Sequence, residues 1–413
     1  MRVLAAIVAA LAIAPAAAAS PRFVIEGHGW GHGVGMSQWG AYGLALHGWG
    51  YRQILAHYYP GTTLMRERDV TVRVLVATDR RRAVVSSRAP FRVVDAHGHS
   101  VVVAGGKRRV ARGKRTLTFV PGAQPLTLDG AGYRGRVVWH AGSVVNVLPL
   151  ERYLRGVVPW EMPHRWSRAA LEAQTIAARS YALATLRHVL YADTRDQEYG
   201  GIRAETPQTN AAIGATAGRV LTWDGHPALT YYFSTSGGRT AAARDSLPWA
   251  PRVPYLVSVN DPYDALSPHH SWSYGFTARR LARALHVPGV RSLAVEVNGS
   301  GRVAEVVARW RGGARTIDGR TFSTDLDLPS TWFSVVHGGK SAAAPVRTAP
   351  RLRGWIVVVS SVPIADGKPS GRVLRSDDYG LAPGYWVVFR GPYPTAAAAQ
   401  AHASGGAYAR HLG

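Results

Sequence analysis

A change of hydrophobic periodicity after residue 150 constrains the fold of this chain more than any other feature. Residues 70–150 alternate apolar and polar side chains over short runs separated by Gly, Asp and Pro turns, a pattern typical of antiparallel strands. Residues 167–191 contain neither Gly nor Pro and are rich in Ala, Leu and Arg, which predicts the longest helix, with Ser167 as its N-cap. Antiparallel sheets beside one long helix predict an α+β fold.

Other segments add shorter elements. Residues 23–65 contain a short strand and a glycine-rich turn, and helical periodicity then runs over about residues 38–58. Residues 277–286 predict a short helix. Residues 293–319 predict a hairpin with a glycine turn.

The composition excludes several classes of protein. Among 413 residues, Lys and Arg number 49 and Asp and Glu 25, giving a formal net charge of +24, and there is no cysteine. Without cysteine there is no disulfide, thiolate nucleophile, iron–sulfur cluster or Cys-ligated zinc. A hydrophobic fraction of 46% excludes a disordered chain, and the lack of a long apolar run after the N-terminus excludes a polytopic membrane protein.

The basic excess suits an acidic partner, which can be nucleic acid, anionic lipid or an acidic polymer outside the cell. A charge that serves only solubility is the alternative. The most basic stretch, residues 107–115, predicts a solvated hairpin rather than a binding site.

The chain divides into four segments. Residues 1–19 predict a cleaved secretion signal, since Arg2 precedes a short apolar run that ends in small residues; an uncleaved anchor is the alternative. We expect residues 20–336 to form a core, residues 337–351 a flexible linker, and residues 352–413 a small α/β module of strand, strand and helix. Export to the cell exterior disfavours nucleic acid and favours cell-wall polymers as the acidic partner.

Common catalytic and nucleotide-binding motifs are missing. The alternating glycines of residues 27–35 fail the spacings of dinucleotide-binding and P-loop motifs. Ser37 lacks the second glycine of a G-x-S-x-G elbow, because Trp39 occupies that position. His28 and His32 are four residues apart, but the glycines between them oppose a helix that would align them on a metal.

Glu161 is the carboxylate that stands out. Two prolines, Pro159 and Pro163, fix the backbone around it, and the residues between them are apolar. Apolar surroundings disfavour a carboxylate, raise its pKa and suit it to general acid catalysis. A surface Glu in a turn is the alternative. Arg179 lies on the predicted long helix, where a solvated or salt-bridged side chain is the alternative to a functional one.

Five segments together resemble the SpoIID/LytB family of cell-wall proteins. They span roughly residues 23–336 and read GHGWGHGVGMSQWGAYGLA (27–45), YLRGVVPWEMP (153–163), EAQTIAARSYAL (172–183), YYFSTSGGRT (231–240) and PYLVSVNDPYD (254–264). The resemblance implies a lytic transglycosylase of the sporulation type, which cleaves the MurNAc–GlcNAc bond of glycan strands lacking stem peptides and leaves 1,6-anhydro-MurNAc ends. Other members of the family are enhancers of a wall amidase, which is the non-catalytic alternative.

The resemblance also assigns residues. Glu161 falls on the family's catalytic Glu of the EMP motif, and Arg179 on the Arg of its AARxYAL helix. Arg239 occupies the position of a third essential residue, a Lys after STSGG. Arg keeps the positive charge of that Lys, but it stays protonated and so cannot act as an acid or base in the reaction. Some members bind zinc through His and Cys, but Phe233 stands where a His is common, so we expect no metal and no cofactor.

One carboxylate suffices for this reaction. Most glycosidases need two, but in a lytic transglycosylase the C6 hydroxyl of the substrate is the nucleophile. Intramolecular attack has an effective molarity on the order of 10⁵ M or more, which replaces an activated water. Glu161 would protonate the glycosidic oxygen and then accept the proton of O6, while Arg179 and Arg239 would hold the lactyl carboxylate or orient Glu161.

The glycine-rich segment precedes the catalytic region here, whereas the family places it after, as in a circular permutation. Permutation requires neighbouring chain ends, so a strand ending near Ser334 should lie beside the mature N-terminus. His32, Ser37 and Gln38 are expected to line the substrate groove together with Ser236 of STSGG, and a packed turn is the alternative.

The C-terminal module resembles half of a SPOR-like peptidoglycan-binding domain through GYWVVFRGPYPTAAAA (384–399). The resulting hypothesis is an exported enzyme of the cell wall that binds glycan strands, with anionic wall polymers or a wall amidase as further partners. The non-catalytic amidase enhancer remains the second hypothesis, and binding to nucleic acid is disfavoured.

Overall fold

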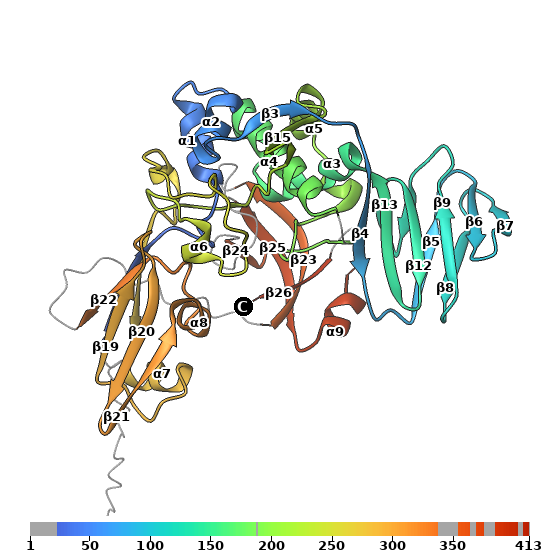
Figure 1. Cartoon of the computed structure of the whole chain (residues 1–413). Helices are drawn as coiled ribbons and strands as arrows, with labels where there is room; N and C mark the ends of the chain where they lie inside the picture. The colour runs from blue at the N-terminus through green and yellow to red at the C-terminus, as the bar shows by residue number, and fades with distance from the viewer. Residues whose placement is uncertain are drawn as a thin grey trace, which may run out of the picture.

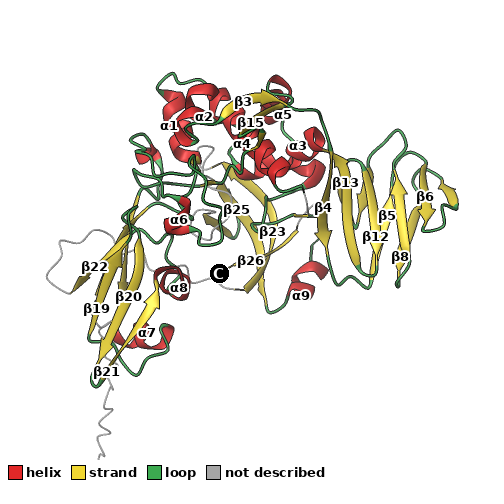
Figure 2. Cartoon of the chain, viewed as in Figure 1, coloured by secondary structure: helices red, strands yellow, loops and turns green. Residues whose placement is uncertain are grey.

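The computed structural model describes residues 23–186, 189–337, 354–363, 369–375, 385–403 and 408–412. The expected secretion signal and all but the first residue of the expected linker lie outside these ranges. The predicted α+β class is confirmed, since several antiparallel sheets surround a group of helices (Figures 1 and 2). None of the helices in the described ranges has the length and hydropathy that a membrane span requires.

The predicted antiparallel region forms two sheets, which extend to the right of the helices in Figure 1. The seven-stranded sheet has the order β14-β4-β13-β12-β9-β6-β7, and the four-stranded sheet the order β11-β10-β5-β8. Side chains of Val85, Phe119 and Trp139 belong to their shared core. The strands are β4 (Thr71–Ala77), β5 (Arg82–Ser86), β6 (Phe91–Asp95), β7 (Ser100–Val103), β8 (Arg108–Arg112), β9 (Thr116–Val120), β10 (Leu126–Leu128), β11 (Ala131–Tyr133), β12 (Arg136–His140), β13 (Ser143–Pro149) and β14 (Leu190–Tyr191).

The hairpin predicted at residues 107–115 is wrong. Strand β8 pairs with β5 at the edge of the four-stranded sheet, while the following strand β9 belongs to the other sheet. Ala111 is the buried position of β8 and its other side chains are exposed, so a short strand with one core residue gains more by joining β5 than by folding back on β9.

The helices lie together at the top of Figure 1: α1 (Gln38–Leu46), α2 (Tyr51–Tyr58), α3 (Leu150–Glu161), α4 (Arg168–Ala184) and α5 (Pro207–Ala215). A short sheet beside them contains β3 (Thr63–Arg66), β15 (Arg219–Trp223) and β16 (His226–Pro227). The single helix expected over residues 38–58 is two helices, because Gly48 between them has φ +84° and turns the chain.

Helix α4 is the longest helix in the described ranges, as predicted, although it ends at Ala184 rather than at residue 191. Ser167 is its N-cap residue, but the serine hydroxyl is buried and makes no capping hydrogen bond. The helix is buried along most of its length, and its side chains belong to three of the apolar clusters of the core. The long helix therefore organises the core around it.

Helix α3 was not predicted: the two prolines were expected to fix the backbone around Glu161, and a turn at the surface was the alternative. The residues Leu150, Leu154, Val157 and Val158 form an apolar face that is buried in the core. This burial outweighs the unfavourable Pro159, which stands inside the helix in its last turn. Glu161 is consequently the last residue of a helix.

The first strand of the core pairs with strands near the end of the core. Strand β1 (Phe23–His28) lies between β18 (Ser271–Phe276) and β22 (Phe333–His337), and Glu26 is opposite Ser334. The predicted proximity of this part of the chain to the start of the core is therefore confirmed, although the strand begins at Phe333 and ends at His337 rather than near Ser334. A separate three-stranded sheet contains β19 (Ser292–Val297), β20 (Val303–Trp310) and β21 (Gly313–Asp318), so the hairpin expected at residues 293–319 has a third strand.

Three short helices accompany these strands. The helix expected at residues 277–286 is found as α7 (Ala278–Ala284). The helices α6 (Ala243–Ser246) and α8 (Gly319–Asp325) were not anticipated.

The glycine-rich segment runs beside the STSGG segment, far away in sequence. Strand β2 (Met36–Ser37) pairs with β17 (Tyr232–Phe233), and Trp30 forms a bridge with Thr235. Gly35 has φ +77°, and a Cβ atom there would lie 2.0 Å from the carbonyl oxygen of Tyr231. Glycine is thus required for this close approach of the two segments.

The C-terminal module is a four-stranded antiparallel sheet in the order β24-β25-β23-β26 with one helix. Its elements are β23 (Gly354–Pro363), β24 (Val373–Arg375), β25 (Tyr385–Tyr393), α9 (Ala396–Ala401) and β26 (Tyr408–Leu412). The expected strand, strand and helix are β23, β25 and α9. The assignment of this module to wall binding stays a prediction.

Candidate active site

Glu161 lies where three separate parts of the chain meet. It is the last residue of α3, and the backbone N–H of Glu198 donates a hydrogen bond to its Oε1 at 3.1 Å. The side chains of Gln38, at the start of α1, and Tyr232, on β17, also donate hydrogen bonds to this carboxyl group. The glycine-rich and STSGG segments therefore both reach the Glu predicted as the catalyst.

Gln197 fixes the orientation of the tyrosine that faces Glu161. Its side-chain amide donates to the hydroxyl of Tyr232 at 2.9 Å and to the carbonyl of Ala178 at 3.2 Å. Its Oε1 atom accepts a hydrogen bond from the hydroxyl of Tyr153 at 3.1 Å. Because the Tyr232 oxygen accepts from Gln197, its own proton is available to Glu161.

Burial raises the pKa of Glu161 to about 8, and the negative charge of Glu198 adds to this increase. The hydrogen bonds from the Glu198 backbone, Tyr232 and Gln38 oppose it. The end of a helix, where unpaired carbonyls point outward, is a further unfavourable place for a negative charge. Glu161 is therefore protonated at neutral pH and can donate a proton to a bound substrate.

Two glycines hold the loop that carries Glu198 against α3. A Cβ atom at Gly156 would lie 2.5 Å from the ring of Tyr199, and one at Gly200 would lie 1.6 Å from the indole nitrogen of Trp160. The N–H of Gly200 donates to the carbonyl of Gly156 at 2.9 Å. This close packing places the backbone N–H of Glu198 at the carboxyl group of Glu161.

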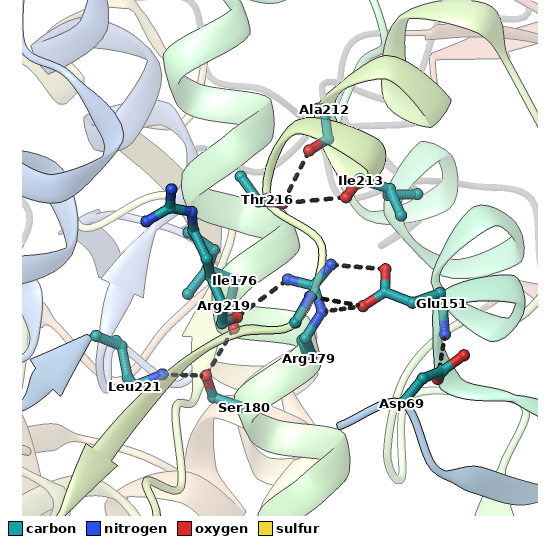
Figure 3. A network of polar contacts seen from close by, with 11 residues as sticks. Asp69, Glu151, Ile176, Arg179, Ser180, Ala212, Ile213, Thr216, Arg219 and Leu221 are labelled. Atoms are coloured by element: carbon teal, nitrogen blue, oxygen red, sulfur yellow. Dashed lines mark hydrogen bonds and ion pairs between the residues drawn. The ribbon is translucent and has the colours of Figure 1, made fainter. Parts of the chain in front are cut away.

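Arg179 makes its contacts near the opposite end of α3. Its Nε and Nη2 donate to the two carboxylate oxygens of Glu151 at 2.7 and 2.9 Å, and its Nη1 donates to the carbonyl of Arg219 at 3.1 Å (Figure 3). The side chain is 1% exposed. Glu151 and Glu161 are ten residues apart on the helix, or roughly 15 Å along its axis. The structure thus joins Arg179 to α3 and β15, not to the carboxyl group of Glu161.

Arg239 is exposed beside the STSGG segment. Its Nε donates to the hydroxyl of Ser258 at 2.8 Å. Its neighbour Ser236 is buried, and the serine hydroxyl donates to Oδ2 of Asp264 at 2.8 Å. Ser236 therefore contacts a second polar cluster, which the sequence did not predict.

That second cluster contains two buried carboxyl groups. His270 Nδ1 lies 2.6 Å from Oδ1 of Asp264, and the hydroxyl of Tyr58 donates to Asp261 at 2.9 Å. Burial and the charge of Asp264 raise the pKa of Asp261 to about 6. Ser37 borders this cluster and also caps α1 by accepting a hydrogen bond from the N–H of Gly40 at 3.1 Å. Ser37 and Gln38 thus connect the aspartates with Glu161.

The ring of His32 packs against the aromatic residues that precede STSGG, Tyr231 and Phe233. Burial and the charge of Arg302 lower its pKa to about 4, so the ring is neutral. Its Nδ1 accepts a hydrogen bond from the N–H of Val34 at 3.0 Å, and the ring packs against Phe233 at 5.5 Å between centroids. The structure therefore brings Gln38 to Glu161 and Ser37 and Ser236 to the aspartates, but gives His32 an apolar neighbour.

Within the residues that the structure describes, no three His, Asp or Glu side chains gather closely enough to hold a metal ion. The expected lack of a metal or cofactor stays a prediction.

Sequence reasoning missed Gln197, Glu198 and Tyr232. Gln197 and Glu198 lie in a polar stretch without periodicity, where nothing in the sequence distinguishes them. Tyr232 could have been noticed, because it lies within the YYFSTSGG segment and its phenol is a hydrogen-bond donor.

Comparisons with known proteins point to one family. Residues 140–223, which include α3 and most of the residues discussed around Glu161, match the family model described as SpoIID, Stage II sporulation protein. The amidase enhancer of Bacillus subtilis is 35% identical over 162 residues, which is 38% of this chain and 22% of that protein.

Two further relatives are named Stage II sporulation protein D. The protein of Bacillus subtilis is 28% identical over 236 residues, covering 50% of this chain and 66% of the relative. That of Bacillus amyloliquefaciens is 29% identical over 255 residues, covering 54% of this chain and 70% of the relative. The chain thus spans about a fifth of the amidase enhancer and about two thirds of the sporulation proteins.

Proposed function

From the premise that this chain contains a SpoIID family domain, we propose that it is a peptidoglycan lytic transglycosylase of the cell wall, with Glu161 as its general acid and base. The observation that carries the proposal is a half-buried carboxyl group whose pKa is raised to about 8 by desolvation, held by donors from two segments distant in sequence. A carboxylic acid that is protonated at neutral pH is what protonation of a glycosidic oxygen requires.

The reaction passes through an oxocarbenium-ion-like transition state at C1 of MurNAc. Glu161 donates its proton to the glycosidic oxygen between MurNAc and GlcNAc, and that bond breaks as O6 of the same MurNAc attacks C1. The Glu161 carboxylate then accepts the proton of the O6 hydroxyl, which regenerates the acid and leaves a 1,6-anhydro ring. Gln38, Tyr232 and the N–H of Glu198 stabilise the carboxylate that exists between these two proton transfers.

The remaining predicted site residues take different roles in this proposal. Arg179 acts as a positioning residue, because its ion pair with Glu151 fixes α3. Arg239 is exposed and supplies a cation for the lactyl carboxylate of the substrate. Ser37 and Ser236 support the groove from the buried aspartates, and His32 borders it. Glycan strands without stem peptides are the proposed substrate.

The second candidate function is the non-catalytic enhancement of a wall amidase. The observation that favours it is the 35% identity with a relative named amidase enhancer. Mass analysis of purified glycan strands after incubation with the protein separates the two functions. Anhydro ends that form with the protein alone support the transglycosylase, whereas an effect that requires an amidase supports the enhancer. Both functions place the protein outside the cytoplasm, in agreement with the expected secretion signal.

The raised pKa predicts how activity depends on pH. Because the first step needs protonated Glu161, kcat/KM should be level towards neutral pH and decrease about tenfold per pH unit well above pH 8. The measurement is the initial rate of anhydro-end release at low substrate concentration from pH 6 to 10. A rate that stays constant to pH 10 would show that protonation of Glu161 does not control the reaction.

Anionic wall polymers are a further proposed partner, and the edge of the four-stranded sheet is the proposed contact. Arg82 on β5 lies directly opposite Arg112 on β8, an unfavourable pairing of like charges. The neighbouring cations are exposed, and within the described residues none of them has an ion-pair partner; they are Lys107, Arg108, Arg109, Lys114 and Arg115. Bound phosphates would relieve this repulsion.

We expect the combined substitutions Arg82→Gln, Arg108→Gln and Arg112→Gln to weaken binding to isolated sacculi roughly tenfold at low salt, because three exposed ion pairs contribute about 0.5 kcal/mol each. The difference from the parent should diminish as added salt screens the charges. The measurement is retention on sacculi over a salt series, before and after extraction of teichoic acids.

The matched control is Arg279→Gln, Arg291→Gln and Arg311→Gln, which removes the same charge from the unit that contains β19 to β21, at the other end of Figure 1. An equal loss of binding in both triple variants would leave net charge, not this sheet edge, as the explanation. Loss that persists on extracted sacculi would point to the glycan instead of the phosphate polymer.

A further inference from the structure

The C-terminal module contacts the loop that holds Glu161. Nη1 of Arg410, on β26, donates a hydrogen bond to Oε1 of Glu198 at 2.8 Å. The two side chains are 27% and 24% exposed, so the ion pair is partly shielded from water. Glu198 is the residue whose backbone N–H binds Glu161 and whose charge raises the pKa of that carboxyl group. A residue of a separate module thus lies one contact away from the candidate catalyst.

The other acidic side chains of this loop have partners nearby in sequence. Asp193 pairs with Arg195 at 2.7 Å, and Asp196 accepts a hydrogen bond from the N–H of Tyr191 at 2.8 Å. Glu198 differs because its cation comes from 212 residues further along the chain. The Glu198 carboxylate is therefore paired with a cation only while the C-terminal module is in contact with this loop.

We propose that the C-terminal module completes the active site, with Arg410 as a positioning residue that holds Glu198 beside the catalytic carboxyl group. This inference rests on the proposed role of Glu161. It gives the module a function in the reaction besides any binding to the wall: the proton affinity of the catalyst depends on whether the module is docked.

Electrostatics gives the direction of this dependence. A Glu198 carboxylate without a partner disfavours ionisation of Glu161 more strongly than one paired with a guanidinium group. Docking of Arg410 therefore lowers the proton affinity of Glu161, and undocking raises it. The titratable and polar groups that face Glu161 from the surrounding elements are Gln38 of α1, Tyr153 of α3, Tyr181 of α4, Asp196, Gln197 and Glu198 of the loop, and Tyr232 of β17.

The test compares four variants of the full chain. Arg410→Gln should move the alkaline limb of the pH–rate profile upward by about 0.5–1 unit. Glu198→Gln should move the limb downward, because it removes the repelling charge. In the double variant Arg410→Gln/Glu198→Gln, the alkaline limb should lie at the same pH as in Glu198→Gln alone. Arg390→Gln, which removes an exposed arginine of the same module on β25, is the matched control and should leave the profile unchanged.

A second measurement remains informative if the protein does not cleave glycan. Titration of the ¹³C-labelled glutamate carboxyl groups by NMR, with Glu161 assigned from the spectrum of Glu161→Gln, follows this group directly. A higher pKa of Glu161 in Arg410→Gln, with an unchanged value in Arg390→Gln, supports the inference whatever the reaction is. Identical Glu161 titrations in the parent and Arg410→Gln would overturn it. Absence of glycan cleavage would contradict only the proposed function.

Discussion

Glu161→Gln is expected to decrease the rate of anhydro-end formation by about 10²–10⁴-fold, the usual contribution of a general acid and base. Gln has the shape of Glu and keeps an oxygen that can accept hydrogen bonds from Gln38 and from the N–H of Glu198. It cannot donate an acidic proton to a glycosidic oxygen or accept one from O6. The measurement is mass analysis of the glycan products over time, with the parent and the variant at equal concentration.

The control variant is Glu296→Gln, which removes an exposed carboxylate on β19 and should cleave at the parent rate. Circular dichroism should show the same fold for all three proteins. Anhydro ends formed by Glu161→Gln at the parent rate would show that another group is the catalyst.

The same substitution also has an expected effect on stability. The pKa of Glu161 is raised in the folded protein, so its contribution is fully present below the unfolded value near 4.5 and is lost as the pH rises through about 8. Gln has no such titration. In chemical denaturation, the stability of Glu161→Gln relative to the parent should therefore increase from pH 5 to pH 9. A constant difference over this range would indicate that Glu161 is ionised throughout.

The second large effect is expected for Arg179→Met, which should lower the free energy of unfolding by about 3–5 kcal/mol. The substitution leaves the carboxylate of Glu151, with a side chain 22% exposed, and the carbonyl of Arg219 without the guanidinium group. The measurement is urea denaturation at neutral pH. Arg168→Met is the control: Arg168 also pairs with a glutamate, but its side chain is 75% exposed, so the loss should be at most about 0.5 kcal/mol.

The alternative role of Arg179 makes a different prediction. If Arg179 contacted the substrate, Arg179→Met would decrease kcat/KM even at temperatures at which the variant is fully folded. Its free energy of unfolding would then be close to that of the control variant. Arg179→Lys separates the two further, because a lysine keeps the charge but forms no paired hydrogen bonds with Glu151.

The fold class could be predicted from the sequence, and so could the identity of the segments that meet at the candidate site. Periodicity predicted α4 and the antiparallel region because each has a long and regular pattern. The position of Glu161 beside the glycine-rich and STSGG segments followed from the family resemblance, not from any local signal. Gln38 was expected to line the groove, and the structure places its side chain on the candidate catalyst itself.

Other features depend on contacts that no local pattern records. The prolines near Glu161 gave no indication of a helix, but burial of the apolar face of α3 extends the helix through Pro159. Glu198 looks like any solvated acid in a polar stretch, and its importance comes from its backbone N–H and from Arg410, 212 residues away. The ion pair of Arg179 with Glu151 likewise joins residues whose spacing in sequence carries no signal.

The pairing of β1 with β22 has a mechanical consequence. Phe23, the first residue of β1, is opposite His337, the last residue of β22. The segments before Phe23 and after His337 therefore leave the core from the same end of one strand pair. Tension applied at Phe23 and His337 would open the hydrogen bonds of that pair one after another and would be carried by β1 and β22 rather than by α3. Load applied at these two residues would therefore act on the strand pair, whereas load applied through the C-terminal module would also act on the contact of Arg410 with Glu198.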